Sequence, residues 1–177
     1  MSLLVTGFGP FGEVTDNASA HLAESSGHPF AVIEVAYAAL DEFIQKIAKN
    51  PPEEMLLLGV DINAKKMRLE TVAHNHIGSK TDVRGEVWGP GPIDPQVPPQ
   101  LSATLWNPEA LEPNDYCEPG YDAGGYLCNY SFFRAAQFLT NTRVGFIHIP
   151  TFETLKQEIQ LAELSRKLES CRSRVLA

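Results

Sequence analysis

The sequence predicts an α/β fold, specifically a three-layer α/β/α sandwich with a mostly parallel central sheet. Short apolar runs alternate along the chain with segments of helical periodicity, which is the pattern of successive strand and helix units. No internal repeat or low-complexity tract interrupts this alternation. The chain has 177 residues, of which 44% are hydrophobic and 20% charged, and this size predicts a single domain over 1–177 with one core.

The first elements are a strand, a glycine-rich loop and a short helix. Leu3–Thr6 is an apolar run typical of a buried strand, and it stops at the loop Gly-Phe-Gly-Pro-Phe-Gly of residues 7–12. Asp16 or Asn17 then caps a helix that runs to about Ser25.

A second strand and an amphipathic helix follow. Phe30–Ala36 has the apolar content of a strand. Between residues 39 and 49, apolar side chains recur at spacings of three and four, which predicts a helix with one apolar face.

The middle of the chain contains two more strands and a long irregular region. Met55–Leu58 is fully apolar, and Met67–Ala73 alternates as a half-buried strand that carries Glu70. Eight of the 13 prolines lie between residues 90 and 119, so we expect a long loop there with one short helix near residues 98–105.

A helix, a strand and a last helix complete the pattern. The first of these covers Tyr126–Leu139 and carries Cys128 in its first turn. Val144–Ile149 is a strand that ends at Pro150. The last helix runs from Thr154 to about Arg172, and the basic residues near its end suit the helix dipole.

Composition excludes several classes of protein. The apolar content is too high for disorder, and no run approaches the roughly 18 apolar residues that a membrane span requires. The first residues lack the basic and apolar regions of a signal peptide, so a cytoplasmic protein without a membrane partner is expected. A net charge of -8 with scattered basic residues argues against nucleic acid as a partner. Three cysteines, Cys117, Cys128 and Cys171, leave at least one thiol free.

The glycine-rich loop matches the spacing of a dinucleotide-binding fingerprint. Gly7, Gly9 and Gly12 follow a strand, and Glu34 lies about twenty residues further on, where such sites place a ribose ligand. A pyrophosphate site needs bare amides at a helix start, whereas Pro10 lacks an N–H and the helix begins several residues later. A structural or pocket-forming turn is therefore the favoured interpretation, and no cofactor is expected.

His74 and His76, with Asp82 downstream, have the spacing of metal ligands at the end of a strand. Zinc sites need a third and fourth ligand with orienting partners, and no cysteine pair or His-Glu-x-x-His motif supplies them. Histidines at a strand end are the simpler interpretation, so no metal is expected.

Cys128, His148 and Glu70 form a candidate nucleophile, base and orienting residue. A thiol in the first turn of a helix meets unpaired amides and the positive end of the helix dipole, which favour the thiolate form. His148 lies near the carboxyl end of a buried strand, where α/β active sites gather. Glu70 is placed to orient the imidazole, as acyl transfer requires. Each residue alone is also compatible with a purely structural role.

Four segments resemble those of the type I pyroglutamyl peptidases, cysteine peptidases that remove N-terminal pyroglutamate. The opening TGFGPFG with Asn17-Ala18-Ser19 resembles their TGFxPFG…NPS start, and LETVAHN, residues 69–75, resembles their ERVAxN segment. AGGYLCN, residues 123–129, resembles AGxYxCN, and GFIHIP, residues 145–150, resembles GFIHxP. The four motifs keep the family order across most of the chain, which makes them far more specific together than singly.

The resemblance implies a role for each matching residue. It makes Cys128 the nucleophile, His148 the general base and then acid, and Glu70 the residue that holds the histidine. It further implies that the substrates are peptides with N-terminal pyroglutamate and that a homo-oligomer is possible.

The resemblance also implies a substrate pocket. Phe8 and Phe11 correspond to aromatic residues that line the pocket for the pyrrolidone ring, with Tyr126 at a third such position. Lys80 stands where the family has an arginine thought to assist the oxyanion, so the charge is kept but the bidentate fork is lost.

Other segments depart from the family pattern. GVDINA, residues 59–64, replaces GxAxGR, and the IPDN stretch is reduced to Thr81-Asp82. These changes leave open a member of the family that acts on another substrate, or that has lost activity and serves as a binding protein. An NAD-dependent enzyme built on the glycine loop is a third hypothesis.

Overall fold

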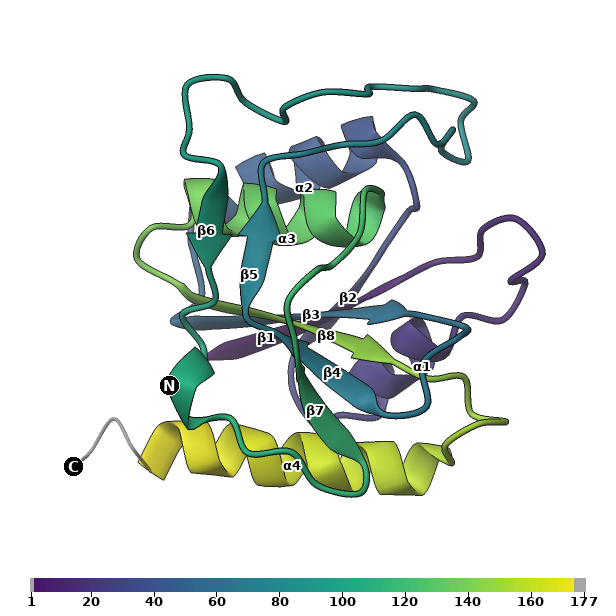
Figure 1. Cartoon of the computed structure of the whole chain (residues 1–177), viewed down its shortest axis with the longest axis vertical. Helices are drawn as coiled ribbons and strands as arrows, with labels where there is room; N and C mark the ends of the chain where they lie inside the picture. Colours follow the sequence, from purple (N-terminus) through teal and green to yellow (C-terminus); the bar gives the residue numbers. More distant parts are fainter. Residues whose placement is uncertain (1, 174–177) are drawn as a thin grey trace.

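The computed structural model describes residues 2–173, which form a six-stranded sheet, a small two-stranded sheet and four α-helices (Figure 1). The strands of the large sheet are β1 (Leu3–Phe8), β2 (Phe30–Ile33), β3 (Glu54–Val60), β4 (Met67–Glu70), β7 (Cys117–Gly120) and β8 (Arg143–Ile149). The helices are α1 (Ala18–Glu24), α2 (Tyr37–Ala48), α3 (Leu127–Phe138) and α4 (Gln157–Ser173). The remaining elements are β5 (Val72–His74), β6 (Gln100–Ser102) and the 3-10 helix Pro108–Ala110.

The large sheet has the order β2-β1-β3-β8-β4-β7. Its first four strands, β2 to β8, run parallel. β4 is antiparallel to β8, and β7 is parallel to β4. The mostly parallel central sheet predicted from the sequence is therefore confirmed, with an antiparallel pair at the centre of the site described below.

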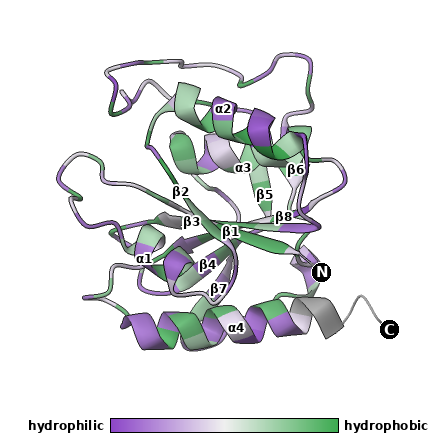
Figure 2. Cartoon of the chain, turned by 180° about the vertical axis from the view of Figure 1, so that it is seen from behind, coloured by the Kyte–Doolittle hydropathy of each residue, from purple (hydrophilic) through white to green (hydrophobic). Residues whose placement is uncertain are grey.

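Helices cover both faces of this sheet. α2 and α3 pack together on one face, whereas α1 and α4 lie on the other (Figure 1). α4 is banded in hydrophobic and hydrophilic colours (Figure 2), and its Leu164 and Leu168 are buried. These layers confirm the predicted α/β/α sandwich.

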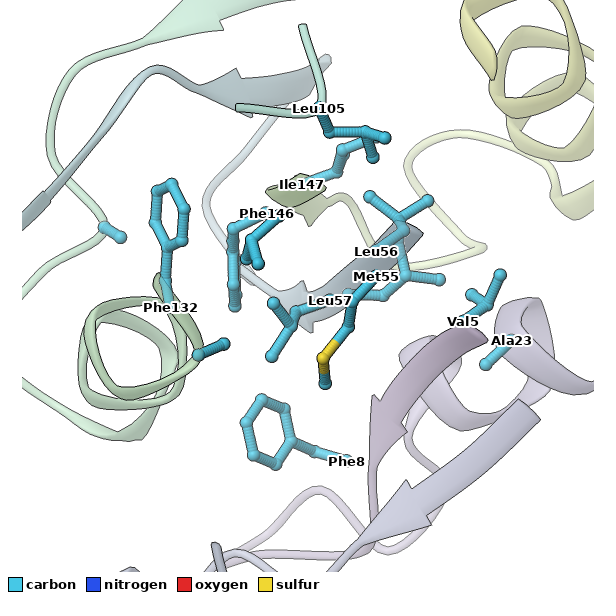
Figure 3. Close-up of a cluster of buried hydrophobic side chains, with 14 of the residues drawn as sticks. Val5, Phe8, Ala23, Met55, Leu56, Leu57, Leu105, Phe132, Phe146 and Ile147 are labelled. Carbon is cyan, nitrogen blue, oxygen red and sulfur yellow. The ribbon is translucent and has the colours of Figure 1, made fainter. Parts of the chain in front are cut away.

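An apolar core joins the helices to the sheet (Figure 3). Phe132 of α3 stacks on Phe146 of β8, with ring centroids 6.0 Å apart, and both side chains are fully buried. Packing of this kind fixes relative position because protein interiors leave few voids. The contact holds the helix that carries Cys128 above the strand that carries His148.

The start of α1 is tied to the glycine-rich loop. Asn17, rather than Asp16, caps the helix by accepting the Ser19 N–H at 3.0 Å, and its amide donates to the Gly9 carbonyl at 2.9 Å. Gly7 is needed because an added Cβ would lie 2.2 Å from the Ser19 carbonyl oxygen.

The prediction of one strand over Met67–Ala73 is wrong. The segment divides at Thr71 into β4, in the large sheet, and β5, which pairs with β6. Thr71 donates both its N–H and its hydroxyl to the Gly120 carbonyl, each at 2.8 Å, and this contact marks the point where the chain leaves the large sheet.

The prediction of a helix near residues 98–105 is also wrong, because residues 100–102 form β6. The preceding proline-rich segment is held by Asn75, whose amide donates to the Asp94 and Val97 carbonyls at 2.7 and 2.9 Å. β7 was not predicted, since Pro119 disfavours a strand; the sheet tolerates this proline because β7 is an edge strand. Within residues 2–173, no helix is long and apolar enough to cross a lipid bilayer.

Candidate active site

Three separate elements carry the residues of the predicted triad. Glu70 ends β4, His148 lies near the end of β8, and Cys128 is in the first turn of α3. β8 lies between β3 and β4, so His148 is opposite Gly59 on one side and Arg68 on the other. The sheet therefore brings together residues that are far apart in the sequence.

His148 and Glu70 are in direct contact. The imidazole Nδ1 lies 2.7 Å from Glu70 Oε1, and the Glu70 side chain is fully buried. Space for this carboxylate depends on Gly120 of the neighbouring β7, because a Cβ there would lie 2.3 Å from Glu70 Oε2. The Trp106 indole donates to the Glu70 carbonyl at 3.2 Å and further fixes the end of β4.

Cys128 also interacts with the His148 imidazole. Its thiol hydrogen-bonds His148, and an added Cβ at Gly59 would lie 2.7 Å from the sulfur, so β3 passes close to the thiol. The next residue, Asn129, is fully buried and bonds the main chain of β5, with the His74 N–H and carbonyl both at 2.8 Å. This anchor fixes the first turn of α3 and therefore the position of the sulfur.

The charges around His148 stabilise its protonated form. Burial alone would lower its pKa, but interactions with Cys128 and Glu70 outweigh burial and raise the pKa of His148 to about 9. An imidazolium between a thiolate and a carboxylate is the arrangement that nucleophilic cysteine chemistry uses.

A small apolar cavity opens beside Cys128. It has a volume of about 20 Å³, and its lining residues are Phe8, Phe11, Asn17, Val35, Val60, Tyr126, Leu127 and Cys128. Phe8 is buried, whereas Phe11 and Tyr126 are partly exposed and form the rim. All three predicted pocket aromatics therefore line one cavity together with the predicted nucleophile.

Lys80 lies at the same rim. Its ammonium is 4.4 Å from the centroid of the Tyr126 ring and 5.7 Å from that of Phe11, within the range of cation–π contacts. The Lys80 carbonyl accepts the Tyr37 hydroxyl at 3.3 Å, and the Tyr126 hydroxyl donates to the Thr81 carbonyl at 3.0 Å. These bonds hold the segment around Lys80 against the pocket.

Two charged residues beside the triad were not predicted as part of the site. Arg68 Nε lies 3.4 Å from Glu70 Oε1, and its Nη1 lies 2.8 Å from Asp61 Oδ2. The signal for Arg68 was its place two residues before Glu70, since side chains at that spacing share one face of a strand. Asp61 was singled out only as part of a segment that departs from the family pattern.

The residues considered for a dinucleotide site and for a metal site have other contacts. Glu34 forms an ion pair with Arg84 at 2.6 Å. His74 Nε2 contacts the Tyr121 carbonyl at 3.0 Å, and the Asp82 carboxylate accepts main-chain N–H groups, among them that of Tyr37 at 3.1 Å. Within the described part of the chain, no group of three His, Cys, Asp or Glu side chains is arranged to hold a metal ion.

Comparison with known sequences identifies a family. A family model described as pyroglutamyl peptidase matches residues 1–167. Pyrrolidone-carboxylate peptidase 1 of Caldanaerobacter subterraneus is 29% identical over 167 residues, which cover 85% of this chain and 82% of that protein. The pyrrolidone-carboxylate peptidase of Bacillus subtilis is 28% identical over 169 residues, covering 84% of this chain and 77% of that protein.

Solved structures agree with this result. The pyrrolidone carboxyl peptidase of Thermus thermophilus superposes with a TM-score of 0.77 at 30% identity, covering 94% of this chain and 97% of that chain. A variant of the pyrrolidone carboxyl peptidase of Pyrococcus furiosus gives a TM-score of 0.82 at 22% identity, covering 98% of this chain and 99% of that chain. At 22% identity, the similarity to the Pyrococcus furiosus structure is evidence of the fold alone.

Proposed function

The chain belongs to the pyroglutamyl peptidase family, and on this premise we propose that it hydrolyses the amide bond after an N-terminal pyroglutamyl residue by acyl transfer to Cys128. The observation that carries the proposal is one constellation: Cys128 contacts His148, His148 contacts Glu70 at 2.7 Å, and an apolar cavity opens at Cys128. A nucleophile, a base and an orienting carboxylate beside a pocket are the parts that acyl transfer needs.

The first half of the reaction forms an acyl-enzyme. The Cys128 thiolate attacks the carbonyl carbon of the pyroglutamyl group, and the main-chain amides at the start of α3 stabilise the oxyanion. Such donors typically contribute about 3 kcal/mol each. The His148 imidazolium then gives its proton to the leaving amine, and the peptide without its first residue departs.

The second half releases pyroglutamate. Neutral His148 takes a proton from a water molecule, the resulting hydroxide attacks the thioester carbonyl, and the thiolate of Cys128 leaves. His148 ends the cycle protonated, as it began. Glu70 keeps Nδ1 of the imidazole as the donor toward itself, so Nε2 is the atom that exchanges protons.

Specificity comes from the aromatic cavity. The pyrrolidone ring is uncharged and mostly apolar, which suits walls formed by Phe8, Phe11 and Tyr126 with few polar groups. The Lys80 ammonium lies over the rings of Phe11 and Tyr126, where it is placed to meet the substrate carbonyl. The volume of about 20 Å³ suits little more than a water molecule, so the partly exposed Phe11 and Tyr126 move when the ring enters.

A second candidate is a member of the family with altered specificity or without activity. It is favoured by the changed segment after β3, where Asp61 contributes a carboxylate to the surroundings of the triad. The two candidates differ in whether a pyroglutamyl amide is turned over.

The test is hydrolysis of a pyroglutamyl fluorogenic amide by the wild type and by Cys128→Ser, with prolyl and glutaminyl amides as controls. We expect the wild type alone to release the fluorophore, and only from the pyroglutamyl amide. If no amide is cleaved while iodoacetamide still alkylates Cys128 rapidly, the triad acts on another substrate. If Cys128 also resists alkylation, the proposal is wrong and the inactive alternative holds.

A further inference from the structure

The triad continues from Glu70 into an ion pair. Arg68 of β4 lies between two carboxylates, with Nε 3.4 Å from Glu70 Oε1 and Nη1 2.8 Å from Asp61 Oδ2. From His148 outward, basic and acidic side chains alternate along this line: His148, Glu70, Arg68 and Asp61.

Both members of the ion pair are fixed by the fold. Arg68 is directly opposite His148 in the register of β4 and β8. The Asp61 N–H donates to the Ile149 carbonyl at 3.0 Å, and its carboxylate accepts the Asn63 N–H at 2.9 Å. Burial alone would raise the pKa of Asp61, but the Asn63 N–H and the Arg68 guanidinium hold that pKa below its usual value.

This arrangement differs from an ordinary surface ion pair. The side chains of Arg68 and Asp61 are only 27% and 25% exposed, and that of Glu70 is 0% exposed. Exposed pairs contribute little to stability, whereas a charge removed from water needs a partner. Glu70 Oε2 has no hydrogen-bond partner among the described residues, so Arg68 and His148 share the other oxygen as its charged partners.

We propose that Arg68, held in place by Asp61, is a positioning residue that keeps the Glu70 carboxylate oriented toward His148. The inference deepens the proposed function, since it rests on the same triad. Arg68 acts through Glu70 and touches neither the substrate nor the sulfur.

The physical reason is charge balance in a buried site. Without Arg68, two carboxylates would compete for one imidazolium, and Asp61 would draw His148 away from Glu70. Without Asp61, the guanidinium would lose its fixed position and its charge would face the imidazolium unbalanced. Each member therefore needs the other.

A double-mutant cycle tests whether Arg68 acts through Glu70. We expect Arg68→Met to lower kcat for the pyroglutamyl amide about tenfold, equivalent to about 1.4 kcal/mol in the barrier, with KM nearly unchanged. Arg68→Lys should recover part of the loss because it restores the charge. In the Glu70→Gln background, the same Arg68→Met change should alter kcat less than about twofold, since the carboxylate on which it acts is gone.

The contrary results are equally definite. An equal loss of kcat with and without the Glu70 carboxylate would show that Arg68 acts independently of it, and a rise in KM alone would make Arg68 a substrate contact. Either result overturns the proposal. Arg166→Met is the matched control, since it removes an arginine paired with Glu163 on α4, and it should leave kcat unchanged.

A readout without a peptide substrate separates this inference from the proposed function. The rate of Cys128 alkylation by iodoacetamide at neutral pH should fall in Arg68→Met and partly recover in Arg68→Lys, with Cys128→Ser as the blank. If the wild type cleaves no pyroglutamyl amide but this order of rates holds, the proposed function fails and the inference stands. If the rates are equal while thermal midpoints match the wild type, the inference fails. If Arg68→Met does not fold, Arg68→Lys and Asp61→Asn decide the question by the same two readouts.

Discussion

His148 carries the pH behaviour of the site at the scale of single residues. Its pKa of about 9 means that the imidazolium persists well above the usual value of about 6.5 for histidine. Because the proposed mechanism pairs this imidazolium with a thiolate, the alkaline loss of activity should come only as pH rises through about 9.

Glu70→Gln tests this assignment. The substitution removes a negative charge that stabilises the imidazolium, so the alkaline limb of kcat/KM should move to lower pH. The measurement is kcat/KM for the pyroglutamyl amide between about pH 5 and about pH 10. Glu163→Gln on α4 is the control and should leave the limb in place; an unmoved limb in Glu70→Gln would contradict the role given to Glu70.

Single residues of the site were predictable where the local sequence carries the signal. Cys128 follows a turn of small residues at a helix start, and His148 lies alone among apolar neighbours at the end of a strand. Arg68 offered only its spacing of two residues from Glu70 on one strand. Asp61 gives no such signal, because what matters is its distance from Arg68, which lies two strands away in the sheet. That distance depends on strand order, which one sequence does not specify.

At the scale of elements, the antiparallel β4 is the part of the sheet that assembles the site. It carries Arg68 and Glu70 along the flank of β8, and β7 covers its other side. Gly120 of β7 leaves no room for a side chain beside Glu70, because an added Cβ would lie 2.3 Å from Glu70 Oε2.

Gly120→Ala should therefore damage both stability and catalysis. We expect a loss of about 1–3 kcal/mol in the free energy of unfolding, as for other overpacked cores, and a fall in kcat as Glu70 turns from His148. The measurements are urea denaturation and amide hydrolysis. Adding Glu70→Asp, which is shorter by one methylene, should restore stability but not activity; if it restores neither, the steric explanation is wrong.

The elements were predictable to different degrees. Strands β1, β3 and β8 and helices α2 and α3 follow apolar runs or helical spacing that local sequence encodes. β5, β6 and β7 are short and exist through long-range contacts, such as the Thr71 bonds to Gly120 and the Asn75 bonds to the proline-rich segment. The local sequence pattern does not encode such pairing, and the prolines in these segments argue against strands.

At the scale of the whole molecule, we propose that the chain forms one cooperative domain. One cluster of buried side chains joins elements from β1 to α4, and the layer formed by α1 and α4 supports the sheet from the face opposite α3. On this basis α4 contributes stability and no chemistry.

Leu164→Ala tests whether α4 contributes to stability without contributing to catalysis. Leu164 is 2% exposed, so its truncation should cost about 3 kcal/mol in the free energy of unfolding and leave kcat/KM of the folded protein unchanged. Urea titrations should show one transition in which tryptophan fluorescence and amide hydrolysis are lost together. Two separated transitions would contradict the single domain, and a fall in kcat/KM before unfolding would give α4 a part in the site.

The position of β8 has a consequence for biosynthesis. β8 is the last strand in sequence among the described residues, yet it lies between β3 and β4 in the middle of the large sheet. While a nascent chain still has these residues inside the ribosome, β3 and β4 have no partner on that side, and open strand edges favour aggregation. The site cannot close around Cys128 until His148 has emerged, so the proposed triad cannot assemble on a nascent chain whose β8 residues are still inside the ribosome.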